Sequence, residues 1–213
     1  MKSTLFAFAV LAAWGIPALA GPPLICHRLE IGDARSLPWG ADSAVWNQPV
    51  ENYNVAHLAD ETLGLLSPDA PVIVRMETIR RAVIYARHFP QAQKELILKL
   101  KARTGDAEAR GDGLAMFDYG YVIEAMKEAS WTEGPGGQWN AAMNLDGYPW
   151  VTRALAAGHD NPEMEFAAAL IVMGRNDLNS QHEHAEKALA ARGGDPLLAR
   201  NVAGFFGSAK ASQ

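Results

Sequence analysis

The positions of proline constrain the fold of this chain more than any other feature. Proline is favoured in the first turn of a helix, because its missing N–H would have no helical partner there. Five prolines stand where helical patterns begin: Pro71, Pro90, Pro149, Pro162 and Pro196. Three of them follow, by one or two positions, a residue whose side-chain oxygen can cap free amides: Asp69, Asn161 and Asp195. These signals predict a chain built mainly of helices.

The apolar periodicity places the expected helices near 52–66, 71–88, 91–103, 113–129, 149–157, 162–174, 178–192 and 196–206. The turns between them are short, which favours antiparallel hairpins. A strand pattern occurs only at 24–31, where Ile25, Leu29 and Ile31 alternate with other residues. We therefore expect an all-α domain of about eight helices in stacked antiparallel hairpins over 52–213. An extended N-terminal arm and loop over 21–51 should precede it.

The first twenty residues have the pattern of a secretory signal peptide. Lys2 supplies a positive start, an uncharged apolar run follows from Leu5 to Ile16, and Ala18-Leu19-Ala20 is a small-x-small cleavage pattern. The apolar run is too short to span a membrane as a mature helix, and no later run is longer. We expect an exported protein, periplasmic or extracellular and soluble after cleavage near Ala20.

Composition and motifs argue against several functional classes. The formal net charge of -5 argues against a general nucleic-acid binder. Cys26 is the single cysteine, so an intramolecular disulfide is excluded, and with His27 it offers too few ligands for zinc. The stretch 182–186 (HEHAE) lacks the second histidine of a zinc-protease helix. Nucleotide-binding loops and the nucleophile elbow are also missing, so no metal or cofactor is predicted.

The segment 162–196 resembles a tetratricopeptide repeat. Pro162 and Pro196 are separated by about 34 residues, the length of such a repeat, which would hold a helix, a turn and a helix. The stretch from Ala185 to Pro196 follows that family's pattern, with Ala191 and Asp195-Pro196 at its end. The first helix departs from the pattern, since Ala168 stands where a large aromatic residue is expected. The resemblance implies stacked helical hairpins and names no partner.

Charged residues interrupt helices that are otherwise apolar. In 71–88, Glu77, Arg81 and His88 form a narrow polar stripe that we expect to face water, whereas Arg80 and Arg87 project from the apolar flank. Buried charges need partners, so we expect these two arginines to meet Asp118 or Glu165 across the core. The cluster is interpreted either as an ion-pair network that fixes helix register or as a polar pocket. In a pocket, Asp118 or Glu165 would be the catalytic acid or base.

Five tryptophans follow the signal peptide, and they fall in two segments without a clear helical pattern. Trp39 and Trp46 lie in 36–51, and Trp131, Trp139 and Trp150 lie in 130–150. Indole rings on exported proteins can stack on sugars or peptides, or can pin long loops to the body of the protein. With Arg80 and Arg87, these tryptophans are the candidate ligand-binding residues.

Charge is unevenly distributed along the chain. Residues 75–103 carry a surplus of Lys and Arg, and residues 104–165 carry a surplus of Asp and Glu. We expect the two segments to attract one another within one fold; the alternative is a basic surface for an anionic polymer.

Two functions remain open. The preferred one is an exported helical-hairpin binding module that recognises a protein, a peptide or a glycan. The alternative is a cofactor-independent hydrolase or lyase acting on cell-wall or polysaccharide material. The first requires tryptophans exposed on one face, and the second requires a carboxyl with a raised pKa in a tryptophan-lined cleft.

Overall fold

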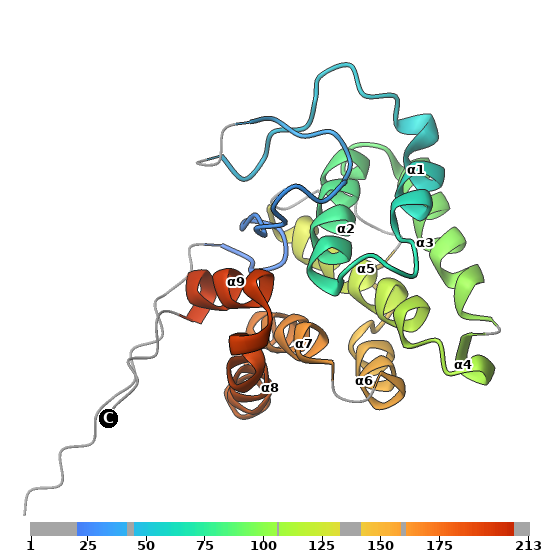
Figure 1. Ribbon diagram of the computed structural model, residues 1–213. Helices are drawn as coiled ribbons and strands as arrows, with labels where there is room; N and C mark the ends of the chain where they lie inside the picture. Colours follow the sequence, from blue (N-terminus) through green and yellow to red (C-terminus); the bar gives the residue numbers. More distant parts are fainter. Residues whose placement is uncertain (1–20, 42–44, 106, 133–141, 159–160, 207–213) are drawn as a thin grey trace, which may run out of the picture.

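The computed structural model describes residues 21–41, 45–105, 107–132, 142–158 and 161–206 (Figure 1). Its helices are α1 (Leu58–Leu65), α2 (Val72–Ala86), α3 (Pro90–Thr104), α4 (Ala107–Arg110), α5 (Gly113–Thr132), α6 (Tyr148–Ala157), α7 (Pro162–Gly174), α8 (Leu178–Ala191) and α9 (Pro196–Phe206). Short 3-10 turns at Val55–His57 and Arg192–Gly194 precede α1 and α9. No strand occurs among the described residues, and the predicted all-α class is confirmed. The predicted signal peptide and Trp139 lie outside these ranges.

Helices α2 and α5 form the centre of the fold. Helix α5 packs against α2, α3, α6 and α7, and α2 also contacts α1 and α7. In Figure 1, α1, α3 and α4 lie on one side of this pair, and α7, α8 and α9 lie on the other. All 15 residues of α2 are buried, including its charged ones. The polar side chains of α2 must therefore find partners inside the protein.

Four of the five predicted proline starts are confirmed, since Pro90, Pro149, Pro162 and Pro196 lie in the first turns of α3, α6, α7 and α9. Helix α2 begins one residue after Pro71 and has no cap from its own chain segment. Its first amide donates instead to Glu163 Oε2 of α7, at 2.5 Å. A carboxyl from a distant helix thus caps the central helix, at the end where negative charge is favoured.

The N-terminal arm crosses α2 without forming the predicted strand. Residues 22–26 make a single turn, in which the amide of Cys26 donates to the carbonyl of Pro22 at 2.9 Å. Leu24, Ile25, Leu29 and Ile31 are buried as the alternating pattern suggested. The strand prediction was wrong because the backbone of the arm is bound by side chains of α2 rather than by a neighbouring strand.

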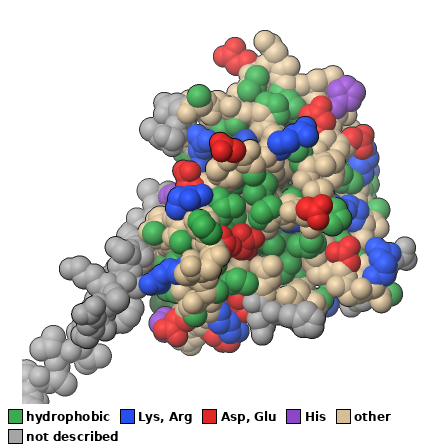
Figure 2. Space-filling view, viewed as in Figure 1, with side chains coloured by type: hydrophobic (Ala, Val, Ile, Leu, Met, Phe, Trp, Pro, Cys, Tyr) green, Lys and Arg blue, Asp and Glu red, His purple; other side chains and the backbone are tan. Residues whose placement is uncertain are grey.

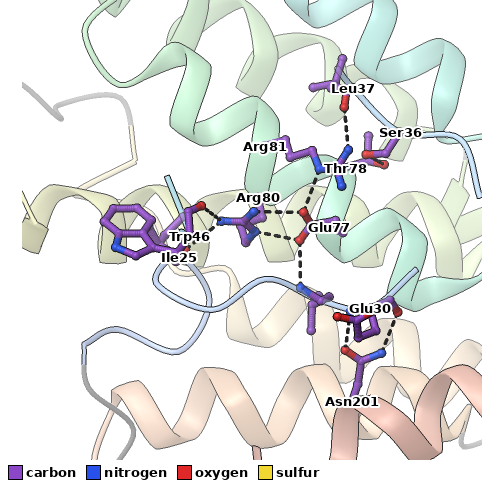
Figure 3. Close-up of polar contacts among 11 residues, drawn as sticks. Ile25, Glu30, Ser36, Leu37, Trp46, Glu77, Thr78, Arg80, Arg81 and Asn201 are labelled. Atoms are coloured by element: carbon purple, nitrogen blue, oxygen red, sulfur yellow. Dashed lines mark hydrogen bonds and ion pairs between the residues drawn. The ribbon is translucent and has the colours of Figure 1, made fainter. Parts of the chain in front are cut away.

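Figure 3 shows the polar cluster that holds the arm. The Glu77 carboxylate accepts hydrogen bonds from Arg80 Nε at 2.7 Å, from Arg81 Nε at 2.8 Å and from the amide of Leu29 at 3.1 Å. Arg80 also donates to the carbonyls of Ile25 and Trp46, and Arg81 donates to that of Leu37. The expectation that Glu77 and Arg81 face water was wrong, because the arm covers them.

A second buried cluster involves different partners from those expected. Arg75 Nη1 lies 2.6 Å from Asp118 Oδ2, and Arg103 Nη1 lies 3.3 Å from the same oxygen. Arg80 pairs with Glu77 of its own helix, and Arg87 is only half-buried at the end of α2. The predicted pairing of Arg80 and Arg87 with Asp118 or Glu165 was therefore wrong, because Arg75 and Arg103 approach Asp118 from α2 and α3.

The same cluster joins the two charged segments of the sequence. Arg75 and Arg103 come from the basic segment, and Asp118 comes from the acidic one. On the face in Figure 2, Lys and Arg are interspersed with Asp and Glu, and hydrophobic side chains are exposed between them. This face of the molecule therefore carries no continuous basic patch.

Candidate functional site

A pocket of about 350 Å³ opens between the C-terminal half of α5 and the end of α7. Helix α5 contributes Glu124, Lys127, Glu128 and Trp131, and the end of α7 contributes Gly174 and Arg175. The four α5 residues follow the i, i+3, i+4, i+7 spacing, which places them on one face of a helix. Trp131 stands at this pocket with 55% of its surface exposed. The volume lies within the range of small-ligand sites.

Glu128 is the buried carboxyl of the pocket. Its Oε2 accepts a hydrogen bond from the amide of Leu24 at 2.7 Å, and the amide of Ile25 also donates to this carboxyl. Burial raises the pKa of Glu128 to about 8, with a smaller contribution from the negative charge of Glu124. At neutral pH the pocket therefore contains a protonated carboxyl, which can donate a hydrogen bond.

Glu124, in contrast to Glu128, is surrounded by positive charges and hydrogen-bond donors. Its Oε1 lies 2.9 Å from Arg175 Nη2 and 3.2 Å from Lys127 Nζ, and it accepts the amide of Gly147 at 2.7 Å. Arg175 also forms an ion pair with Asp146 at 2.5 Å. Both cations of the pocket are thus paired with carboxylates.

A hydrogen-bonded chain of side chains lies beside the pocket and includes Glu165. The carboxylate of Glu165 binds His184 Nδ1, and His184 Nε2 is 2.8 Å from the hydroxyl of Tyr148. The guanidinium of Arg175 lies 5.1 Å from the centre of the Tyr148 ring. Arg175 therefore contacts both this chain and the pocket. Glu165 is 2% exposed, and its contact with His184 links α7 to α8 and, through His184, to Tyr148 of α6.

Of the predicted site residues that the structure describes, only Trp131 lines this pocket. Asp118 is fully buried in the cluster with Arg75, and Glu165 is bound to His184. Trp39 packs on Arg80, 5.0 Å from its guanidinium, and Trp46 is partly buried and packs against the core. Trp150 packs edge-on against Tyr119. These three rings pack against other residues of the protein, and their role in ligand binding stays a prediction.

The sequence analysis missed Glu124 and Glu128, although a signal for them was present. The two acids are four residues apart in an apolar helix, and Trp131 follows on the same face. Asp118 in the same helix was predicted to be the catalytic acid or base instead, because the residues on its helix face are apolar.

Comparison with known proteins gives no relative for this chain: no family model, no curated protein and no solved structure matches it. The likeness of 162–196 to a tetratricopeptide repeat therefore rests on the α7–α8 hairpin and its sequence alone. Among the described residues, no helix is both long and apolar enough to cross a membrane. In the same part of the chain, no three His, Cys, Asp or Glu side chains are grouped as metal ligands.

The buried carboxyls predict an unusual dependence of stability on pH. Burial raises the pKa of Glu128 to about 8, of Glu163 to about 7 and of Asp118 to about 6. Each group binds its proton more tightly in the folded than in the unfolded chain, so their stabilising contribution is lost as pH rises. We expect the free energy of unfolding to fall between pH 5 and pH 9.

Urea unfolding at unit pH intervals measures this slope. In Glu128→Gln the decrease should become smaller throughout this range, and only a small part should remain between pH 7 and pH 9, because the pKa values of Glu163 and Asp118 are about 7 and about 6. A free energy of unfolding that is constant or rises from pH 6 to pH 9 would contradict the assignment of protonated buried carboxyls.

Proposed function

We propose that this protein is an exported helical module that binds a glycan, a peptide or a segment of another protein at the Trp131 pocket. The observation that carries the proposal is a largely exposed indole beside a pocket that also contains a buried carboxyl. Aromatic side chains beside a concave site are enriched among the residues that bind ligands and partners. Trp131 lies on the same helix face as Glu124 and Glu128, so a ligand that stacks on its ring has polar partners beside it.

Replacement of Trp131 tests this proposal. We expect Trp131→Ala to weaken binding by at least about tenfold, because a stacked aromatic ring contributes on the order of 1–3 kcal/mol to recognition. The wild-type signal is the change in tryptophan fluorescence during titration with oligosaccharides, peptides and cell-wall fragments. Isothermal titration calorimetry gives affinities for the variant, which lacks the reporting ring.

Leu98→Ala is the matched control, since Leu98 is 52% exposed on α3 and does not line the pocket. This variant should bind like the wild type. If Trp131→Ala binds every ligand of the wild type with unchanged affinity, the binding site lies elsewhere and the proposal is wrong.

A hydrolase or lyase is the second candidate function, and the environment of Glu128 favours it. A carboxyl with a pKa of about 8 beside an ion-paired carboxylate can act as a general acid on a glycosidic oxygen. Asp118 and Glu165 do not line the pocket, so in this candidate Glu128 replaces them as the acid. Glu128→Gln would then abolish turnover of a polysaccharide substrate while binding persists.

A further inference from the structure

We propose that the pocket takes an uncharged saccharide, which places one ring on Trp131 and accepts a hydrogen bond from the Glu128 carboxyl through one of its oxygens. This inference rests on the proposed function and names the class of ligand. It follows from the orientation of the Glu128 carboxyl, from the pairing of the nearby charges and from the form of the pocket wall.

The two oxygens of Glu128 face different surroundings. Oε2 lies toward the arm and accepts the amide of Leu24. Oε1 lies toward Gly174, where an added Cβ would be only 2.7 Å from it and 3.9 Å from the Trp131 ring. Since the amide of Leu24 already donates to Oε2, the proton is best placed on Oε1. The donor therefore points to the wall where Gly174 and Trp131 meet.

The charges of the pocket are already compensated within the protein. Lys127 and Arg175 both pair with Glu124, and Arg175 also pairs with Asp146. An anionic ligand would have to compete with these carboxylates for the cations. A cationic ligand would need a free carboxylate, whereas Glu128 is protonated at neutral pH. An uncharged ligand with many hydroxyl groups fits both conditions without breaking an ion pair.

The form of the wall favours a saccharide over a peptide side chain. Apart from Trp131 and Ile171, the residues that line the pocket are polar, charged or glycine. The exposed surface of this wall is nevertheless more apolar than polar, because the stems of the charged side chains contribute to it. A pyranose ring presents an apolar C–H face to the indole and hydroxyl oxygens to Glu128, which matches a ring beside a donor.

Other titratable or charged groups lie near Glu128. They are Glu124 and Lys127 on its own helix, Arg175 after α7, and Cys26 of the arm, with Tyr121 on α5. Burial raises the pKa of the Cys26 thiol and of Tyr121 above their ordinary values, so both stay neutral near pH 8. A change in binding between pH 7 and pH 9 therefore reports on Glu128.

The pKa of the Glu128 carboxyl can be measured in the absence of any ligand. We expect carbon-13 NMR of glutamate side-chain carboxyls to show one group that titrates near pH 8 and is missing in Glu128→Gln. If every glutamate carboxyl of the folded protein titrates below about pH 6, the proposed donor is absent and the inference fails.

The class of ligand is tested by calorimetric titration of the full-length mature protein. The probes are neutral tetrasaccharides of β-linked glucose, β-linked N-acetylglucosamine and α-linked glucose, a polyuronate, and a set of uncharged peptides. We expect a neutral saccharide to bind, with an affinity about tenfold weaker at pH 9 than at pH 7, because only the protonated form is competent. In Glu128→Gln the amide keeps a donor at this place, so binding should become independent of pH.

Gly174→Ala supplies an independent test of the geometry, because its Cβ would displace Oε1 or narrow the pocket. We expect it to reduce saccharide binding at least tenfold, while Gly204→Ala, which meets no atom within 4 Å, leaves binding unchanged. Peptide binding that requires Trp131 and is indifferent to pH would overturn this inference and leave the proposed function intact. If neither saccharides nor peptides bind, both are wrong.

Discussion

Replacing Glu77 with glutamine should lower the free energy of unfolding by about 4 kcal/mol. Breaking a buried ion pair costs about 3–5 kcal/mol, because the partner is left as an uncompensated buried charge. Glu77 is fully buried, pairs with both Arg80 and Arg81, and accepts a hydrogen bond from the amide of Leu29. Burial alone would raise the pKa of Glu77, but the two guanidinium groups outweigh it and hold that pKa below its usual value.

The measurement is urea unfolding at pH 7, followed by circular dichroism. Arg87→Ala is the control from the same helix, since Arg87 is half-buried and belongs to neither buried cluster. We expect that control to change stability by less than about 1 kcal/mol. A loss below about 1 kcal/mol in Glu77→Gln would show that water enters the cluster and that the arm does not seal it.

The helical architecture could be predicted because its signals are local. Proline in the first turn and apolar periodicity act within a few residues, and the positions of α3, α6, α7, α8 and α9 follow from them. The buried clusters could not be predicted in the same way. Arg75, Arg80 and Arg81 are all possible partners for an acid, and only the packing of the arm and of α3 decides which pairs form.

The arm shows most clearly why the rest of the prediction failed. A polar stripe on a helix normally faces water, so Glu77 and Arg81 were assigned to the surface. In the structure the arm supplies the missing partners through its backbone, as at Leu29 and Leu37. Backbone groups are the same in every sequence, and no residue pattern in 21–51 indicates that they will bind α2. The arm is thus part of the core, although its sequence resembles a loop.

The arm also connects the core to the candidate site. Glu77 and Arg80 bind it at Leu29 and Ile25, and Glu128 of the pocket binds it at Leu24. A carboxyl of the pocket is therefore held by the chain segment that directly follows the predicted cleavage site. Because the amide of Leu24 fixes Oε2 of Glu128, it determines the direction in which Oε1 faces.

Gly120→Ala should lower the free energy of unfolding by about 3 kcal/mol, although alanine is the better helix former by about 1 kcal/mol. A Cβ at Gly120 would lie 2.6 Å from the carbonyl oxygen of Gly147 and 2.9 Å from both Trp150 Cβ and Val151 Cγ2. The first of these contacts is with backbone, which cannot move aside as the end of a flexible side chain can. The substitution must therefore push α6 away from α5.

Gly64→Ala is the matched control, since Gly64 lies within α1 and an added Cβ there meets no atom within 4 Å. The same change of residue should stabilise the protein there by up to about 1 kcal/mol, so urea unfolding of the two variants separates helix propensity from packing. Equal effects at Gly64 and Gly120 would mean that α5 and α6 are not in close contact. Since Gly147, at the start of α6, also donates to Glu124 of the pocket, a displaced α6 should reduce ligand binding as well as stability.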